Sequence, residues 1–228
     1  MKKLFKTLMI MALCGATMGI VSCKKDSHNV PDGYVDLGLP SGLLWATCNL
    51  GATTPDGYGN YYAWGETSTK NTYNWSTYRY ATVDADGDLQ TLTKYNTLES
   101  YGTVDNKTTL EASDDVATAV LGNGARIPTK AEWQELRDNT TAEWTTVNNV
   151  NGRKFTAANG NSLFLPAAGN RSGSALYYDG THGGYWSSSL VESYPLGAWN
   201  VGFGSDNQGV GYYYRGYGVS VRAVRSQN

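Results

Sequence analysis

The amino-acid sequence predicts one compact α+β domain behind an N-terminal leader. Strand-like runs are short and are separated by Gly, Asn, Asp or Pro, which is typical of small antiparallel sheets. Helical patterns occur in only two segments, both in the middle of the chain. No linker, repeat or change of composition interrupts residues 33–228, so we expect a single domain there.

The strand-like segments include one with a clear buried face near the end of the chain. There Val219, Val221 and Ala223 alternate with polar residues, which is the two-residue period of a half-buried strand. The segment before it alternates in the same way. In chain order, the expected strands are 34–38, 43–48, 60–64, 153–157, 162–166, 185–189, 198–203 and 218–225.

The two predicted helices carry start and stop signals. Acidic residues at 114–115 precede the apolar run 116–121, and Gly122 ends it. The second helix, over 130–137, follows a capping box in which Thr129 and Glu132 are three residues apart. Trp133 and Leu136 form its expected buried stripe.

The first 22 residues have the pattern of a secretory signal peptide. A basic stretch with Lys2, Lys3 and Lys6 precedes the uncharged, mostly apolar run 8–20, which is too short to span a membrane. The segment 20–23 reads Ile-Val-Ser-Cys and resembles the lipobox of bacterial lipoproteins, in which Cys23 is acylated. An ordinary signal peptide with a chance cysteine is the alternative.

A leader of this kind predicts a lipid-anchored protein of a bacterial cell envelope. We expect the signal peptide at 1–22, the lipidated Cys23 with a polar tether at 23–32, and the folded domain at 33–228. The outer membrane is favoured, and the sequence leaves open whether the domain faces the surface or the periplasm. The slightly acidic chain, with a net charge of −2, argues against nucleic-acid binding.

Cysteine and histidine are too scarce for most catalytic or metal sites. Cys14 leaves with the leader and Cys23 carries lipid, so only Cys48 remains in the domain and no internal disulfide can form. We expect Cys48 to be a buried hydrophobic side chain rather than a nucleophile. The domain holds a single histidine, His182, and nothing in the sequence predicts that it pairs with Cys48.

Six motifs in a fixed order resemble the Fibrobacter succinogenes major paralogous domain, a family of exported bacterial proteins. Residues 126–133 of the third motif, which read Arg-Ile-Pro-Thr-x-x-Glu-Trp, are also similar to the formylglycine-generating enzyme superfamily. The resemblance implies a C-type-lectin-like fold, with two helices around a small twisted antiparallel sheet and a long, loop-rich C-terminal half that presents the binding face. The motifs are 39–52, 62–66, 125–133, 163–169, 185–189 and 220–222.

The chain lacks the residues that known catalytic sites of this kind need. Formylglycine-generating enzymes use a pair of cysteines, which Cys48 alone cannot supply. We therefore expect no catalytic residue, metal or cofactor. The acidic run 84–88 lacks the spacing of a calcium loop and predicts an acidic turn, with calcium binding as the alternative. Glu66 is expected to be a structural hydrogen-bonding group.

The C-terminal half has the composition of a binding surface, rich in Tyr, Gly, Ser and Asn as antibody paratopes are. In an extended chain Tyr212 and Tyr214 face one way and Tyr213 the other. The alternative is that these tyrosines fill an irregular interior. The predicted ligand-binding residues are Tyr178, Trp199, Asn200, Asp206, Asn207, Tyr212, Tyr213, Tyr214, Arg215 and Tyr217.

Some C-type-lectin-like bacterial proteins are targets of diversity-generating retroelements, which vary residues near the C-terminus. The resemblance therefore implies the hypothesis that the C-terminal region of this chain is varied in the same way. Trp199, Phe203, Gln208, Arg215 and 220–222 would then be framework. The varied positions would be Gly197, Gly202, Gly204, Gly209, Gly211, Tyr212, Tyr213, Tyr214, Gly216 and Tyr217.

Together these features predict a non-catalytic, lipid-anchored protein that binds a protein or glycan ligand. Two alternatives stay open at this point. One is a divergent enzyme of the formylglycine-generating type that uses Cys48, His182 or Glu66, and the other is a structural or adhesive subunit of the envelope.

Overall fold

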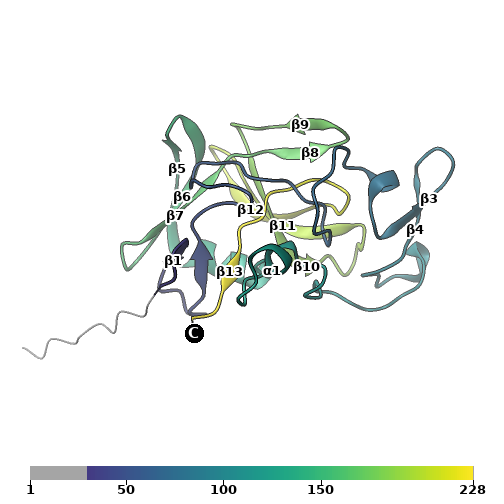
Figure 1. Cartoon of the computed structure of the whole chain (residues 1–228), viewed down its shortest axis with the longest axis horizontal. Helices are drawn as coiled ribbons and strands as arrows, with labels where there is room; N and C mark the ends of the chain where they lie inside the picture. Colours follow the sequence, from purple (N-terminus) through teal and green to yellow (C-terminus); the bar gives the residue numbers. More distant parts are fainter. Residues whose placement is uncertain (1–29, 228) are drawn as a thin grey trace, which may run out of the picture.

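A computed structural model describes residues 30–227 (Figure 1). The predicted signal peptide and the lipidation site Cys23 lie outside the described residues. Within them, the strands are β1 (Tyr34–Asp36), β2 (Leu44–Ala46), β3 (Ala81–Val83), β4 (Leu89–Leu92), β5 (Thr140–Val147), β6 (Val150–Ala157), β7 (Ser162–Pro166), β8 (Asn170–Ser172), β9 (Ala175–Tyr177), β10 (Gly183–Leu190), β11 (Gly197–Phe203), β12 (Gln208–Tyr214) and β13 (Val224–Arg225). The helices are α1 (Val116–Leu121) and α2 (Lys130–Asp138), with 3-10 turns at Trp75–Thr77 and Glu99–Tyr101.

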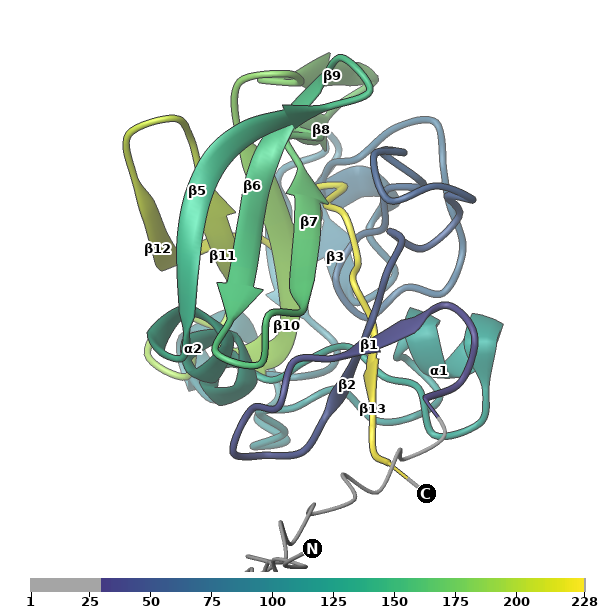
Figure 2. The same cartoon turned by 90° about the vertical axis from the view of Figure 1, so that its left-hand side faces the viewer.

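The strands of this part of the chain form five small antiparallel sheets. Three sheets have three strands each, in the orders β1-β2-β13, β5-β6-β7 and β10-β11-β12, and β3-β4 and β8-β9 are hairpins. In Figure 2 the β5-β6-β7 sheet lies in front, α2 sits at its lower end, and the β11–β12 hairpin lies at the left edge. The first and last strands, β1 and β13, both pair with β2.

The predicted α+β, C-type-lectin-like fold is wrong. The structure is mostly β, with 37% strand and 11% helix in separate small sheets, and it does not show two helices around one twisted sheet. The reason is the region between residues 50 and 115, where the chain forms loops, two 3-10 turns and a hairpin instead of joining a common sheet. Both α-helices are short, with six and nine residues.

The two helices themselves are where the sequence predicts them. Asp115 caps α1, because its side chain accepts hydrogen bonds from the backbone N–H groups of Ala117 and Thr118. Thr129 and Glu132 form the expected capping box of α2. Trp133 and Leu136 are buried, so the predicted inward stripe is confirmed.

Several strand predictions need correction. The segment 60–64 forms no strand and makes a single bridge, Tyr62 to Val219. In the segment 218–225 only β13 is a strand, and Ser220 and Arg222 are fully buried, so no solvent face exists there. Six strands fall outside the predicted set: β3, β4, β5, β8, β9 and β12.

Two hydrophobic clusters form the interior. In the first cluster, Trp133 of α2 packs with residues of β2, β6, β7 and the C-terminal part of β11. The other gathers Trp64, Tyr95 and Trp186 with residues 219–223. The β10-β11-β12 sheet contributes to both clusters, because Val201 and Phe203 belong to the first and Ala198 belongs to the second. This sheet therefore holds the C-terminal tyrosines on a firmly packed base.

Candidate functional site

The β11–β12 hairpin positions most of the predicted ligand-binding residues. In β12, Tyr212 and Tyr214 are 52% and 39% exposed, whereas Tyr213 turns inward and packs against Trp186. The predicted alternation of these three tyrosines is therefore confirmed. Because of it, the predicted residues divide between two faces of the hairpin instead of forming one surface.

The first face is a connected set of aromatic rings, which we call the tyrosine face. Tyr194, in the loop before β11, contacts both exposed tyrosines of β12, with ring centres 5.7 Å from Tyr212 and 6.3 Å from Tyr214. Two rings from segments far away in the sequence extend the set, because Trp75 contacts Tyr214 and Tyr101 contacts Tyr194. Its members are Trp75, Tyr101, Tyr194, Tyr212, Tyr214 and Tyr217.

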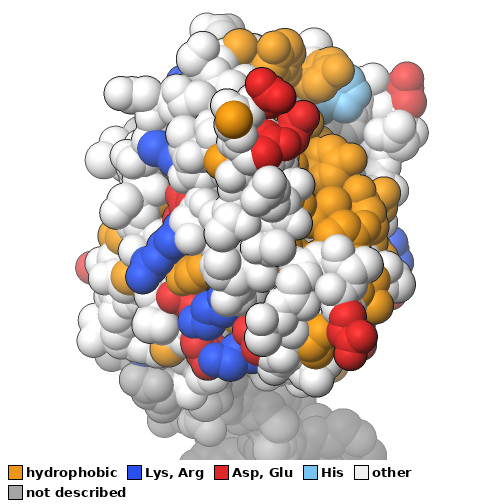
Figure 3. All heavy atoms as spheres, turned by 90° about the vertical axis from the view of Figure 1, so that its right-hand side faces the viewer, with side chains coloured by type: hydrophobic (Ala, Val, Ile, Leu, Met, Phe, Trp, Pro, Cys, Tyr) orange, Lys and Arg blue, Asp and Glu red, His pale blue; other side chains and the backbone are white. Residues whose placement is uncertain are grey.

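This side of the molecule shows a continuous hydrophobic area (Figure 3). The local backbone explains how the rings come together. A Cβ at Gly197 would lie 2.8 Å from the Tyr212 ring, so glycine there lets the ring lie over β11. The Tyr194 hydroxyl donates a hydrogen bond to the Tyr214 hydroxyl at 3.4 Å. This bond, together with burial, raises the pKa of Tyr194 to about 12, so its hydroxyl keeps its proton at neutral pH.

Trp75, Tyr101 and Tyr194 belong to the tyrosine face although the sequence did not single them out. Tyr194 lies in the aromatic-rich C-terminal half and could have been found from that composition. Trp75 and Tyr101 come from two 3-10 turns more than 90 residues earlier. Nothing in their local sequence indicates that Trp75 contacts Tyr214 or that Tyr101 contacts Tyr194.

Arg215 does not belong to this surface, which corrects the expectation of an exposed aromatic cluster around it. Its side chain is fully buried, and its guanidinium lies over the rings of Trp64, Tyr78 and Tyr95 at 5.1, 5.3 and 5.8 Å. It donates hydrogen bonds to the Tyr78 hydroxyl and to the carbonyls of Lys94, Tyr95 and Pro195. Arg215 is therefore part of the interior framework beneath the tyrosine face.

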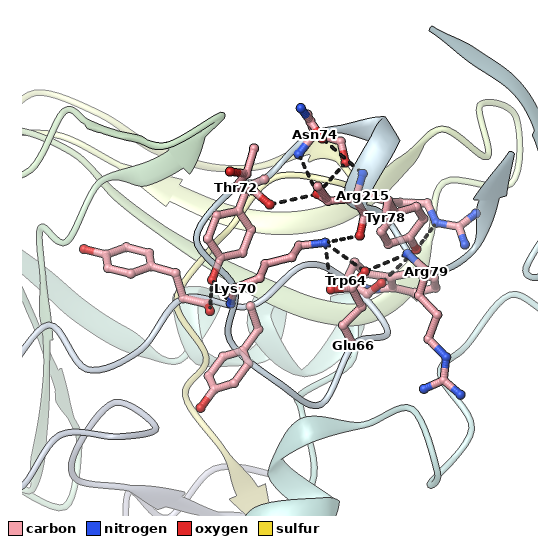
Figure 4. A network of polar contacts seen from close by, with 12 residues as sticks. Trp64, Glu66, Lys70, Thr72, Asn74, Tyr78, Arg79 and Arg215 are labelled. Carbon is pink, nitrogen blue, oxygen red and sulfur yellow. Dashed lines mark hydrogen bonds and ion pairs between the residues drawn. The ribbon is translucent and has the colours of Figure 1, made fainter. Parts of the chain in front are cut away.

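The surroundings of Arg215 form a polar network that includes Glu66 (Figure 4). Glu66 pairs with Lys70 at 2.8 Å and accepts a hydrogen bond from the backbone N–H of Arg79. The Tyr78 hydroxyl, which accepts from Arg215, donates to the carbonyl of Trp64. Glu66 thus has the structural partners expected of it, and they fix the loop that carries Trp75.

The opposite face of the hairpin carries Asn200 and Tyr213. Asn200 is only 3% exposed, and it lies directly across from Gly211 on β12. Together with Gly202 and Gly209 these residues line a shallow hollow of about 390 Å³. The hairpin turn, with the exposed Asp206 and Asn207, closes one end.

The remaining predicted residues lie near the hairpin. Trp199 faces α2, where the Lys130 ammonium lies 3.4 Å from the centre of its ring. The pair lines a separate hollow of about 490 Å³. Tyr178 is exposed in the loop after β9, and its ring contacts His182 at 5.3 Å.

The candidate catalytic groups occupy separate surroundings. Cys48 is partly exposed rather than buried as expected, and its thiol lies 3.7 Å from the Thr47 hydroxyl. His182 is exposed, and its Nδ1 lies 3.1 Å from the Thr181 hydroxyl. No hydrogen bond joins Cys48 to His182 among the residues that the structure covers.

The acidic run 84–88 forms the turn of the β3–β4 hairpin, as predicted. The Asp84 carboxylate accepts hydrogen bonds from the backbone N–H groups of Asp86 and Asp88, so its oxygen stabilises the turn. Between residues 30 and 227, no three His, Cys, Asp or Glu side chains gather in a way that could hold a metal ion.

Comparison with known proteins adds no relative. No protein-family model, curated protein or solved structure matches the chain. Among the described residues, no helix is long and apolar enough to cross a membrane.

Proposed function

We propose that this protein is a non-catalytic binding protein, held at a bacterial cell envelope by a lipid, and that it binds a protein or glycan ligand through the tyrosine face. The observation that carries the proposal is the exposure of Tyr212 and Tyr214 on a rigid strand, next to Tyr194 and Trp75. Large aromatic side chains gathered on one exposed area are typical of binding sites.

The physical case for binding rests on how firmly these rings are held. β12 pairs with β11 along seven residues, and its inward Tyr213 packs on the core. Tyrosine offers a large contact area at the cost of fixing only two torsions. A ligand that covers these rings therefore gains apolar contact while little side-chain freedom is lost.

The non-catalytic part of the proposal is supported by the separation of the candidate reactive groups. Glu66 is engaged by Lys70 and by backbone, and Cys48 and His182 contact the hydroxyls of their own chain neighbours. None of the three lies in the tyrosine face. An activated nucleophile would need a base within hydrogen-bond reach.

The envelope location is supported by the leader and lipobox of the sequence. The six ordered motifs support membership of the Fibrobacter succinogenes major paralogous domain family. The envelope location and the family membership are both proposed from the sequence alone, and neither rests on the observed fold.

The hypothesis of a diversified C-terminal region is supported by some of its positions and not by others. A Cβ at Gly197 or Gly216, both assigned to the varied set, would lie 2.8 or 3.3 Å from neighbouring atoms, and Gln208, assigned to the framework, is exposed. Arg215, assigned to the framework, is fully buried, while Tyr212 and Tyr214, assigned to the varied set, are exposed. Gly202 and Gly209 have open space where a side chain would begin. A near-copy of this segment beside a reverse transcriptase gene is the expected genomic sign.

Photocrosslinking from the tyrosine face tests the binding function. A benzophenone amino acid replaces Tyr212 in the full chain on living cells, and the same substitution at the exposed Thr141 on β5 is the matched control. We expect one defined adduct from position 212 only. The isolated partner should then bind Tyr212→Ala and Tyr214→Ala at least about tenfold more weakly than the unmodified protein. Equal crosslinking from both positions, or unchanged affinity, would contradict the proposal.

A further inference from the structure

The C-terminal end of α1 carries an uncharged and partly apolar surface. Val120 is 56% exposed and Leu121 is 40% exposed, although large aliphatic side chains are most often buried. The positions 119, 123 and 124 are exposed as well. No charged residue occurs from position 116 to position 125, so this exposed end of the helix has no charge of its own.

A hollow of about 270 Å³ continues this surface to the beginning of the described chain. Leu121 lines it together with Gly33 and Tyr34, which lie just before and at the start of β1. The rest of the lining comes from the uncharged residues 46–52, from Ala223 and from Asp32, its one acidic residue. We call the exposed helix residues 119–121 and this hollow the α1 face.

The α1 face lies at the end of the domain that is nearest to the proposed lipid. In Figure 2, α1, β1 and β13 lie together at the lower end of the domain, whereas β12 lies higher. The first described residue, Val30, comes only seven residues after Cys23. Seven residues span at most about 24 Å, so an acylated Cys23 would hold Val30 within that distance of the bilayer surface.

One basic group lies beside the α1 face without an acidic partner. The Arg225 guanidinium lies 5.7 Å from the centre of the Tyr34 ring, and its Nε is buried without a hydrogen bond. Among the described residues, no carboxylate forms an ion pair with it. Arginine and tyrosine next to exposed aliphatic side chains are typical of a membrane interface, where the cation meets lipid phosphate and the aliphatic groups meet acyl chains.

We propose that the α1 face rests on the lipid bilayer that holds the anchor, with Val120 and Leu121 at the boundary between headgroups and acyl chains. This inference rests on the lipid anchor of the proposed function. Two exposed aliphatic side chains would bind a bilayer only weakly by themselves. The anchor makes the contact intramolecular, and the high effective concentration that results favours even a weak contact.

A second copy of this chain is the less favoured occupant of the α1 face. A stable interface between proteins buries about 800 Å² on each partner and needs matching shapes. Two side chains beside a small hollow offer much less than that area. A bilayer needs no matching shape, and the anchor would keep it next to this end of the domain.

Fluorescence quenching in vesicles tests the contact with the lipidated full chain. The vesicles consist of phosphatidylethanolamine and phosphatidylglycerol with some nitroxide-labelled lipid. In a Cys48→Ala background, a fluorophore is attached at Ala119→Cys in α1 or, as the control, at Thr146→Cys, at the end of β5 far from α2, and both positions are exposed. Val120→Asp disrupts the apolar surface, and Leu98→Asp, at another exposed apolar residue, is its matched control.

We expect the nitroxide lipid to quench the label at position 119 and to leave the label at position 146 almost unaffected. Val120→Asp should lower the quenching at position 119 about tenfold, whereas Leu98→Asp should not change it. Thermal unfolding verifies that each variant is folded, and mass spectrometry verifies the lipid on Cys23.

The inference is overturned if the lipidated chain shows equal quenching at both positions or none at position 119, or if Val120→Asp leaves the quenching unchanged. It is also overturned if the label at position 119 becomes shielded only as the protein density rises, because that result would indicate a second copy. A chain without lipid on Cys23 would overturn the proposed anchor as well, so the two failures are distinguishable.

Discussion

The guanidinium of Arg215 lies 5.1 Å from the centre of the Trp64 ring, in the interior of the domain. No carboxylate of the described residues pairs with it. Its charge is instead surrounded by three aromatic rings and three backbone carbonyls. Since Arg215 follows directly after β12, this cage fixes the end of the strand that carries the exposed tyrosines.

Replacement of Arg215 by lysine should lower the free energy of unfolding by about 3 kcal/mol. Lysine lacks the planar fork, so it cannot reach all the carbonyls that Arg215 serves, and buried acceptors are left unpaired. Urea unfolding of the full chain measures the change. Arg79→Lys, at an exposed site, is the control and should change stability by less than about 0.5 kcal/mol. A loss of equal size in both variants would contradict the role of the cage.

Stability should fall between about pH 4 and pH 2 because of Asp114. Burial alone would raise its pKa, but hydrogen bonds from Lys94, Tyr95 and Tyr80 lower it from 3.8 to about 2. A lowered folded-state pKa contributes stability above the unfolded value, and that stability is lost as the pH falls through the folded value. The contribution is about 2 kcal/mol.

The test of Asp114 compares the pH dependence of unfolding in two proteins. Asp114→Asn should lack the decrease between about pH 4 and pH 2, although its stability at neutral pH is also lower. Urea unfolding at several pH values gives both curves. Parallel curves over that interval would show that Asp114 is not the group responsible.

The cap of α1 should contribute more to the free energy of unfolding than a usual helix cap does. One oxygen of Asp115 accepts from Ala117 and Thr118, and the other accepts from the backbone N–H of Ile127, so three donors depend on one buried carboxylate. Asp115→Ala should therefore cost more than the roughly 1 kcal/mol typical of a cap. Thr129→Ala at the start of α2 is the comparison, and thermal unfolding should rank Asp115→Ala as the more damaging change.

Lipid attachment predicts a sharp change in fractionation. Cys23→Ser should remove labelling by radioactive palmitate and move the protein from the membrane fraction to the soluble fraction, because the proposed acyl chains would provide the anchor. Cys14→Ser should change neither property. Persistence of the label in Cys23→Ser would place the modification elsewhere.

The sequence predicted local structure better than the arrangement of the sheets. The capping box of Thr129 and Glu132 and the glycine after residue 121 are signals carried by neighbouring residues, so both helices were found. The aromatic-rich segment 60–64 predicts a strand, but the structure has none there. It is buried because Tyr61 donates from its hydroxyl to the Ala168 carbonyl and Trp64 donates to the Ser187 carbonyl, and such distant partners leave no local pattern.

The candidate site was predicted in part for a similar reason. The alternation of Tyr212, Tyr213 and Tyr214 follows from strand geometry and was predicted. The burial of Arg215 could not be predicted from the sequence. Most of the rings and carbonyls that surround it come from residues more than 100 positions earlier, and one carbonyl comes from Pro195. For the same reason the sequence does not predict that Trp75 and Tyr101 belong to the tyrosine face, because both lie far from it along the chain.

The pairing of β1 and β13 with one central strand has a mechanical consequence. If the proposed lipid anchor and the proposed ligand of the tyrosine face pull on the domain in opposite directions, the load enters through β1, which pairs with β2 at three residues. These pairs would separate before the cage of Arg215 does, so under load the chain would lengthen at β1 while the tyrosine face keeps its shape.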